Sequence, residues 1–376
     1  MTDTELSDAT ARPLELGLDT FGDIALGPDG VPLPAATVIR EVLAEGQLAD
    51  RLGLDFFGVG GHHRPDYAVS APDTVLAGLA TTTSRIRLGT SVTVLSSEDP
   101  IRVFQRFSTV DALSHGRAEI TVGRGSFIES FPLFGLSLDD YEVLFSEKLD
   151  LLAAVLTEEP FEWSGTVRPP VSAGPVMPPT ESGALRTWVG VGGTPQSVVR
   201  AAQYGMPVVI AIIGGASAAF EPLADLYRRA CDEFGHAGLP IGVHSPGHVA
   251  ATDEQAVEEY LPHFLDQMRK IGRERGWAPM SESAARAQMS PEGAVYCGSP
   301  ETVARKIAAT AQVLGASRFQ LKYSNGRLPH DLRMESIRLY GEEVAPRVRE
   351  LLAAAPVDDP ATPPLGQGPS GSGDAR

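Results

Sequence analysis

The sequence predicts one α/β domain over residues 14–354, a single (β/α)8 TIM barrel with insertions. Short runs rich in β-branched and aromatic residues alternate with amphipathic helical stretches along this range, which is the pattern of repeated βα units and a parallel sheet. Eight such runs are present, and they are nearly continuous in apolar residues, as expected for parallel strands. Eight strands favour a barrel over an open sheet, and 376 residues suit one barrel with insertions.

The predicted strands and the first helix follow from the order of these runs. The first helix covers residues 37–52, because its apolar residues recur about every 3.6 positions and form one stripe, and Gly53 ends it. The eight predicted strands are residues 14–21, 55–61, 86–95, 117–125, 187–193, 207–215, 241–251 and 318–326.

Other segments interrupt the alternation or lie outside it. Residues 158–186 contain six prolines, which exclude a long helix, so this segment is an insertion and a candidate lid. A second insertion covers residues 274–293, and a helix is expected to start at Ser299, Pro300 and Glu301. Residues 1–13 are expected to be flexible, and residues 355–376, rich in Pro, Gly and Ser, to be disordered.

Composition and charge argue against several classes of function. The net charge of −17 opposes nucleic-acid binding, which depends on Lys and Arg neutralising phosphates. No run approaches the roughly 18 apolar residues of a membrane span, so no membrane role is expected. The polar N-terminus lacks the features of a secretion signal, which predicts a cytoplasmic protein. Cys231 and Cys297 are too few for a disulfide framework or a cysteine-based metal site.

The fifth predicted strand runs into Gly192 and Gly193, which are followed by Thr194 as helix N-cap and Pro195 at the first helical position. The free backbone N–H groups and the helix dipole predict an anion site there, and the glycines allow a phosphate to approach the backbone. The alternative is that Thr194 only caps a helix and the glycines only turn a corner. The string is neither a Walker A loop nor a dinucleotide fingerprint.

Arg124 stands between Gly123 and Gly125 at the end of the fourth predicted strand. Because strand ends converge in a barrel, its guanidinium is a candidate to complete the phosphate site with charge-assisted hydrogen bonds. The alternative is a structural salt bridge to Glu129 or another nearby carboxylate.

Adjacent histidines, His62 and His63, follow the second predicted strand. Neighbouring side chains point in opposite directions in extended backbone, so one ring is expected to face the end of the barrel where active sites lie. Zinc would need three or four ligands, and no other His or Cys has supporting spacing, so no metal site is predicted. The alternative for each ring is a structural, hydrogen-bonded histidine.

Four segments in their order along the chain resemble bacterial luciferase-like flavin-dependent monooxygenases and related oxidoreductases. The long segment from LGLDFFGVGGHHRPD to ESFPLFG resembles the N-terminal half of that family. WVGVGGTPQSVVRAAQYGMPVVIA is similar to its fifth and sixth strands, and YCGSPETVARKI and RFQLKYSNGRLPHDLRMESIRLYGEEVAP to its last units. The resemblance covers residues 14–350.

The resemblance implies FMN as cofactor and a set of binding residues. The phosphate would be held by an arginine after the fourth strand and by backbone and hydroxyl groups at the start of the fifth helix, here Arg124, Gly192, Gly193, Thr194 and Ser197. A non-proline cis peptide under the flavin ring would fall at Ser91–Val92, a bond that persists only where structure enforces it.

The resemblance also implies that His62 is the catalytic acid or base. The family carries a carboxylate one residue earlier, where this chain has Gly61. The missing carboxylate changes the electrostatic environment of the imidazole. A reductase or dehydrogenase activity is therefore an alternative to the monooxygenase.

The leading expectation is therefore an FMN-dependent monooxygenase that takes reduced FMN from a separate flavin reductase and uses O2 to oxidise a small organic substrate. The family's members usually pair, so a homodimer is expected. One alternative is a dehydrogenase or reductase that uses the deazaflavin coenzyme on the same barrel. The other is a non-catalytic flavin-binding partner subunit.

Overall fold

The computed structural model describes residues 13–27, 29–125 and 127–354. The predicted flexible N-terminus and disordered C-terminal tail lie outside the described residues, apart from Pro13. Within the described part of the chain, no helix is both long and apolar enough to cross a membrane.

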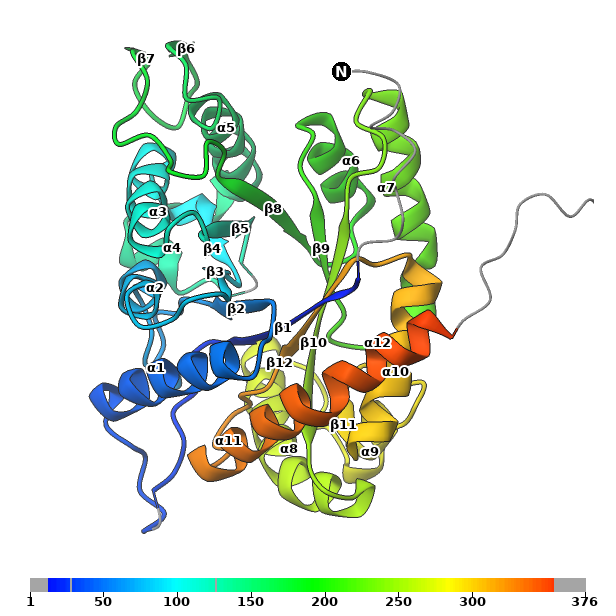
Figure 1. Cartoon of the computed structure of the whole chain (residues 1–376). Helices are drawn as coiled ribbons and strands as arrows, with labels where there is room; N and C mark the ends of the chain where they lie inside the picture. The colour runs from blue at the N-terminus through cyan, green and yellow to red at the C-terminus, as the bar shows by residue number, and fades with distance from the viewer. Residues whose placement is uncertain (1–12, 28, 126, 355–376) are drawn as a thin grey trace, which may run out of the picture.

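Parallel strands form the centre of the molecule (Figure 1). Along the sheet they follow the order β3-β2-β1-β12-β10-β9-β8-β5-β4. Each pair of neighbouring strands in this order is parallel. Their bounds are β1 (Glu15–Thr20), β2 (Phe56–Val59), β3 (Arg87–Thr90), β4 (Thr93–Val94), β5 (Glu119–Gly123), β8 (Arg186–Val191), β9 (Val208–Ala211), β10 (Ile241–Val249) and β12 (Arg318–Lys322).

The sheet closes on itself through the third predicted strand. β3 and β4 both belong to the predicted run 86–95 and are separated by a cis peptide at Ser91–Val92, as the resemblance implies. β4 pairs with β5, and Leu88 of β3 bridges Ala118 at the start of β5. Each of the eight predicted runs therefore contributes to the barrel, and the predicted fold class is confirmed.

Helices surround the barrel (Figure 1). The predicted first helix is α1, which begins two residues earlier than expected, after Pro34. The helices are α1 (Ala35–Arg51), α2 (Pro72–Ala80), α3 (Pro100–Ser114), α4 (Ser130–Leu133), α5 (Tyr141–Val155), α6 (Pro195–Gln203), α7 (Glu221–Glu233), α8 (Asp253–Arg275), α9 (Glu282–Met289), α10 (Pro300–Leu314), α11 (His330–Leu339) and α12 (Ala345–Ala353).

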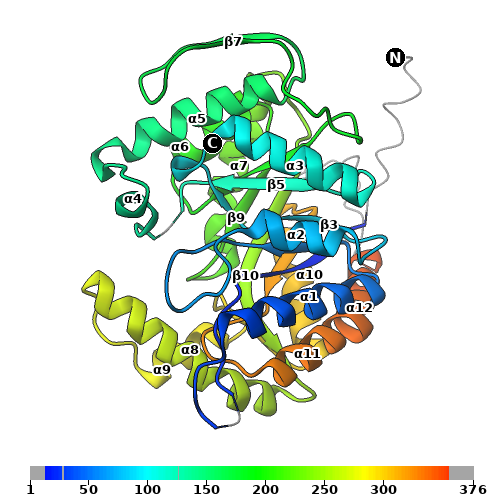
Figure 2. The same cartoon turned by 90° about the vertical axis from the view of Figure 1, so that its left-hand side faces the viewer.

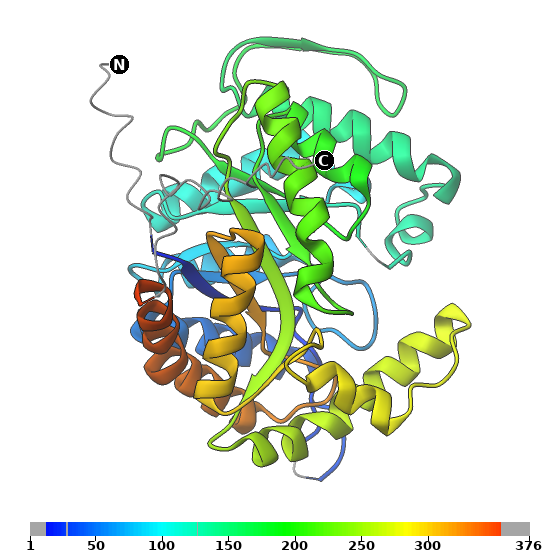
Figure 3. The ribbon, with the colours of Figure 1, turned by 90° about the vertical axis from the view of Figure 1, so that its right-hand side faces the viewer.

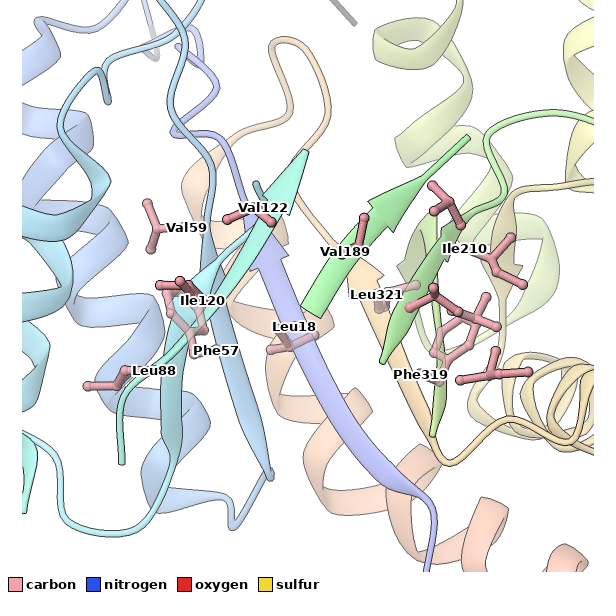
Figure 4. Close-up of a cluster of buried hydrophobic side chains, with 14 of the residues drawn as sticks. Leu18, Phe57, Val59, Leu88, Ile120, Val122, Val189, Ile210, Phe319 and Leu321 are labelled. Carbon is pink, nitrogen blue, oxygen red and sulfur yellow. The ribbon is translucent and has the colours of Figure 1, made fainter. Parts of the chain in front are cut away.

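Alternate residues of the barrel strands other than β4 form the main apolar core together with the surrounding helices. Figure 4 shows the strand side of this cluster, in which all the labelled side chains are buried. These are Leu18, Phe57, Val59, Leu88, Ile120, Val122, Val189, Ile210, Phe319 and Leu321.

The inner positions of the strands carry charge at the amino-terminal end of the barrel. The Arg318 guanidinium is fully buried, donates to Glu119 and, through Nε at 2.6 Å, to Glu15, and lies 4.5 Å from the Trp188 ring. Burial opposes the charge, but Glu119 and Glu15 outweigh it and raise the pKa of Arg318. This paired cluster fills the amino-terminal end, so a ligand is expected at the carboxyl ends of the strands.

The first insertion lacks a long helix, as its prolines predict. Residues 158–186 contain no helix, and β6 (Phe161–Trp163) and β7 (Val171–Ala173) pair as an antiparallel hairpin. The second insertion adds α9 and a second apolar core beneath α8, and is followed by β11 (Tyr296–Gly298), which pairs with β10. The Ser299 side chain accepts from the backbone N of Thr302, which confirms the predicted start of α10.

Candidate active site

The structure brings together three of the predicted phosphate-binding side chains. Arg124 follows β5 and Thr194 precedes α6, and β5 pairs with β8, the strand that leads into α6. Arg124 Nη2 lies 3.3 Å from both Thr194 Oγ1 and Ser197 Oγ, and the two hydroxyl oxygens are 2.6 Å apart. One cation and two hydroxyl groups therefore face one point at the start of a helix.

The backbone beside these side chains is open. A Cβ atom added at Gly192 would have no atom within 4 Å, and one at Gly193 would come no closer than 3.8 Å to Phe220. Gly193 has φ +117°, a conformation that favours glycine. Thr194 takes the N-cap position, but its side chain makes no capping hydrogen bond and instead turns to Ser197 and Arg124. The Thr194 hydroxyl therefore does not act as the simple helix cap of the alternative reading.

A carboxylate of the chain contacts this group of donors. Glu142, near the start of α5, accepts from Arg124 Nη1 and lies 3.5 Å from Arg200 Nη2. Arg124 thus also makes a salt bridge to a nearby carboxylate, which was the alternative to phosphate binding. The partner is Glu142 and not Glu129. An anionic group is thus accommodated between two arginines, and one of these, Arg124, also contacts the Thr194 and Ser197 hydroxyls, which is the chemistry that a phosphate monoester requires.

His62 lies in an aromatic cluster just beyond β2. Its ring centroid is 4.5 Å from that of Tyr67, 4.8 Å from Phe21 and 5.1 Å from Phe127, and its side chain is 12% exposed. The His63 ring instead contacts Phe134, at 5.0 Å. The two adjacent rings have different environments, as the alternation of extended backbone predicts.

The carboxylate partner of His62 comes from a segment that sequence reasoning had assigned elsewhere. Glu129 Oε1 lies 3.5 Å from His62 Nδ1, although Glu129 was considered only as a partner of Arg124. Burial opposes the ionised form, but contact with His62 and its own backbone N–H outweighs burial and holds the pKa of Glu129 below its usual value. At Gly61 an added Cβ would lie 3.0 Å from Pro72 Cδ, so a side chain there would need this neighbour to shift.

The loop that carries His62 is tied to α8. Arg64 Nη2 lies 2.6 Å from Glu274 Oε1, Lys270 pairs with Asp66, and Gln267 Nε2 donates to the Tyr67 hydroxyl at 3.3 Å. Figures 2 and 3, which view the molecule from opposite sides, show the far end of α8 and α4 at the same end of the barrel. These two elements flank the carboxyl ends of the strands.

Ser91 and Val92 lie between β3 and β4, beside the neighbouring strands of the barrel. An added Cβ would come within 2.9 Å of Val92 at Gly123 and 3.0 Å at Gly190, so glycines on β5 and β8 leave the space that the Val92 side chain fills. Ser91 is 7% exposed, and its Oγ lies 3.5 Å from Gln320 Oε1 on β12.

Sequence reasoning missed a polar group on the inner face of the barrel. His244 Nδ1 of β10 lies 2.8 Å from Asp19 Oδ2 of β1, and Gln320 lies on β12 between these two strands. The available signal was a polar residue at inward positions of otherwise apolar runs, as in LELGLDTF and IGVHSPGHVAA. Among the described residues, no cluster of three or more His, Cys, Asp or Glu side chains could hold a metal ion.

Comparison with known sequences places this geometry in context. A family model described as luciferase-like monooxygenase matches residues 20–318. The chain is 30% identical over 343 residues to the protein y4wF of Sinorhizobium fredii, covering 86% of this chain and 95% of that protein. The 4-hydroxyprotoasukamycin monooxygenase of Streptomyces nodosus subsp. asukaensis is 25% identical over 310 residues, 79% of this chain and 84% of that enzyme. A second S. fredii protein, y4vJ, matches at 36% identity over only 35% of this chain and 38% of its own length.

Solved structures share the fold at lower identity. The monooxygenase RslO1 from Streptomyces bottropensis superposes with a TM-score of 0.76 at 23% identity, covering 89% of this chain and 99% of that one. The oxygenating constituent of 3,6-diketocamphane monooxygenase from Pseudomonas putida, solved with FMN, has a TM-score of 0.69 at 19% identity, covering 90% and 99%. The coenzyme F420-dependent tetrahydromethanopterin reductase of Methanopyrus kandleri has a TM-score of 0.68 at 16% identity, covering 90% and 100%.

Proposed function

This chain belongs to the luciferase-like monooxygenase family, and from that premise we propose that it is an FMN-dependent monooxygenase acting on a small organic substrate with reduced flavin and O2. The observation that carries the proposal is the convergence of Arg124, Thr194 and Ser197 beside the open backbone at Gly192 and Gly193. This arrangement suits the terminal phosphate of FMN.

The residues present fit FMN in two places. The phosphate would lie against Arg124, Gly192, Gly193, Thr194 and Ser197, and the pairing of Arg124 with the Glu142 carboxylate supports an anion-binding role for this arginine. The flavin ring would lie against Ser91 and Val92 inside the barrel. Reduced FMN, when bound, supplies the electrons with which one atom of O2 enters the substrate and the other leaves as water.

The protein contributes proton transfer and exclusion of water. His62 is the proposed acid or base, and the carboxylate of Glu129 lies beside its Nδ1. The rings of Phe21, Tyr67 and Phe127 enclose this imidazole and reduce its contact with water. We further propose a cytoplasmic homodimer supplied with reduced FMN by a separate reductase.

The visible absorption spectrum tests the choice of cofactor. Titration of purified protein with FMN and, separately, with the deazaflavin coenzyme F420 is expected to show FMN binding at about micromolar affinity or tighter and weaker binding of F420. F420 relatives share this fold, so the opposite order of affinities would turn the assignment to a deazaflavin dehydrogenase or reductase. Binding of FMN without turnover across a broad substrate panel would indicate a non-catalytic flavin-binding subunit.

Glu142→Gln is expected to tighten FMN binding about 1.4- to fivefold. The Glu142 carboxylate is 61% exposed and competes with the phosphate for Arg124, and exposed ion pairs of this kind are worth about 0.2–1 kcal/mol. Fluorescence quenching of FMN measures the change. Asp140→Asn removes the same charge two residues away and is the matched control, since among the described residues Arg124 pairs with Glu142 and makes no hydrogen bond or ion pair with Asp140. Equal gains in both variants would attribute the effect to overall charge, and a weaker FMN affinity in Glu142→Gln would mean that Glu142 supports the site.

A further inference from the structure

We propose that Asp19, His244 and Gln320 form a binding site for a phenolic hydroxyl inside the barrel, in which His244 takes the proton of the hydroxyl. The inference rests on the proposed function and specifies it, because it gives the chemical class of the substrate and a second proton-transfer residue besides His62. The three residues come from β1, β10 and β12, three neighbouring strands.

Asp19 fixes the orientation and the tautomer of His244. Asp19 is fully buried, and its Oδ2 lies 2.8 Å from His244 Nδ1. An ionised carboxylate can only accept a hydrogen bond, so in the neutral imidazole Nδ1 carries the hydrogen and Nε2 keeps a free lone pair. The His244 side chain is 12% exposed, and in the described part of the chain Nε2 has no hydrogen-bond partner. An imidazole held in this way by a carboxylate is oriented to act as a base.

Gln320 supplies a donor beside this acceptor. His244 and Gln320 are partners in the register of β10 and β12, so their side chains start next to each other on the inner face. Gln320 is 1% exposed, its Oε1 faces Ser91 Oγ, and its Nε2 is buried without a partner among the described residues. A buried polar group left unpaired costs about 1–3 kcal/mol. A hydroxyl satisfies both groups, because it donates to His244 Nε2 and accepts from Gln320 Nε2.

The surroundings favour an aromatic hydroxyl. The Phe21 ring lies nearly parallel to the His244 ring, with an interplanar angle of 15° and 6.4 Å between centroids, and Phe21 also contacts His62 and Tyr67. Aromatic rings of this kind pack well against a phenol. An aliphatic alcohol is too weak an acid for imidazole, whereas a phenol has a pKa near 10, close enough for transfer in a suitable site.

The charge of Asp19 on β1 favours proton transfer to His244, because it stabilises the imidazolium. Lys322 on β12 lies 4.6 Å from the Phe21 ring centre, and its charge is paired with Asp23, whose Oδ2 is 3.1 Å from its Nζ. His62, from the loop after β2, also contacts the Phe21 ring, with 4.8 Å between the ring centroids.

The proton-transfer step balances without any further reactant. The phenol O–H bond breaks, an N–H bond forms at His244 Nε2, and the electron pair stays on the phenolate oxygen. The ring thereby becomes richer in electrons and more reactive toward an electrophilic oxygen donor, and the proton on His244 returns to the product.

The test uses para-nitrophenol, whose ionised form absorbs visible light, with the flavin-free protein. Bound para-nitrophenol is expected to ionise at least about tenfold more readily than the free compound, which corresponds to about one pKa unit. His244→Gln is expected to abolish this gain while keeping an amide donor toward Asp19, and Asp19→Asn to reduce it. His62→Gln and the remote, 87% exposed His115→Gln are expected to retain it.

Several results would overturn the proposal. These are no enhanced ionisation in the wild-type protein, loss of the effect in His62→Gln with retention in His244→Gln, or displacement of the probe by FMN together with weaker FMN binding in His244→Gln. The last result would mean that Asp19 and His244 contact the edge of the flavin ring and not a substrate hydroxyl. Circular dichroism checks folding, and nitrogen NMR of wild-type His244, expected to show the Nδ1–H tautomer, decides the orientation if Asp19→Asn does not fold. Since the probe assay needs no flavin, its failure leaves the FMN proposal standing, and failed FMN binding leaves this one testable.

Discussion

His62→Asn is expected to lower the rate of substrate oxidation by a factor of about 10²–10⁴ and to leave the affinity for FMN close to that of the wild-type protein, because loss of a positioned general acid or base has effects of this size. His62 lies at the end of β2 with Glu129 3.5 Å from its Nδ1, whereas the predicted phosphate contacts come from the segments after β5 and β8. Binding and chemistry are therefore expected to separate.

Stopped-flow measurement of reduced-flavin oxidation, with and without substrate, gives the rates. His63→Asn is the matched control, since His63 contacts Phe134 and lies outside the cluster of Phe21, Tyr67 and Phe127. A rate loss in His63→Asn with none in His62→Asn would show that the other ring is the catalytic one. If neither variant changes the rate, both histidines are structural and the proton-transfer role passes to another residue.

Arg124→Ala is expected to weaken FMN binding about 10- to 150-fold, since a hydrogen bond to a charged group is worth about 1.5–3 kcal/mol. Arg124 is 24% exposed, and its guanidinium lies 3.3 Å from each of two hydroxyls at the start of α6, so its loss removes the charge and leaves the helix in place. Riboflavin, which lacks the phosphate, is expected to bind much more weakly than FMN to the wild-type protein. Its affinity is expected to be unchanged by the mutation.

Fluorescence quenching measures the affinities of FMN and of riboflavin for the wild-type protein and for Arg124→Ala. Arg102→Ala, an exposed arginine on α3, controls for the loss of one positive charge. An equal loss of affinity for riboflavin and for FMN would show that Arg124 maintains the shape of the whole site and does not bind the phosphate. Unchanged FMN titration would leave the ion pair with Glu142 as the role of Arg124.

Local pattern was sufficient for the elements of this barrel. The eight predicted runs became its strands because they are rich in β-branched or aromatic residues and most have glycine near a boundary, and these preferences act within a few residues. Ser299 and Pro300 marked the start of α10 for the same reason, since a cap depends on its immediate neighbours. The candidate anion site at Gly192–Ser197 is also local, and only Arg124 had to be brought to it by the pairing of β5 with β8.

The partners of the charged residues were decided by tertiary structure. Glu129 faces His62 while Glu142 faces Arg124, although Arg124 and Glu129 are only five positions apart in sequence. Glu129 lies beside His62, which comes from the loop after β2, and α5 carries Glu142 to Arg124 instead, so the short separation in sequence does not decide the pairing.

Only closure of the barrel brings Asp19 to His244 and His244 beside Gln320, residues separated by up to 301 positions between Asp19 and Gln320. By itself the sequence determined which segments are strands and helices, where glycine and proline punctuate them, and which family they resemble, since each of these depends on neighbouring residues. Strand order, register and closure decided which polar side chains meet inside the barrel, because those contacts depend on how distant segments pack and no local periodicity encodes them.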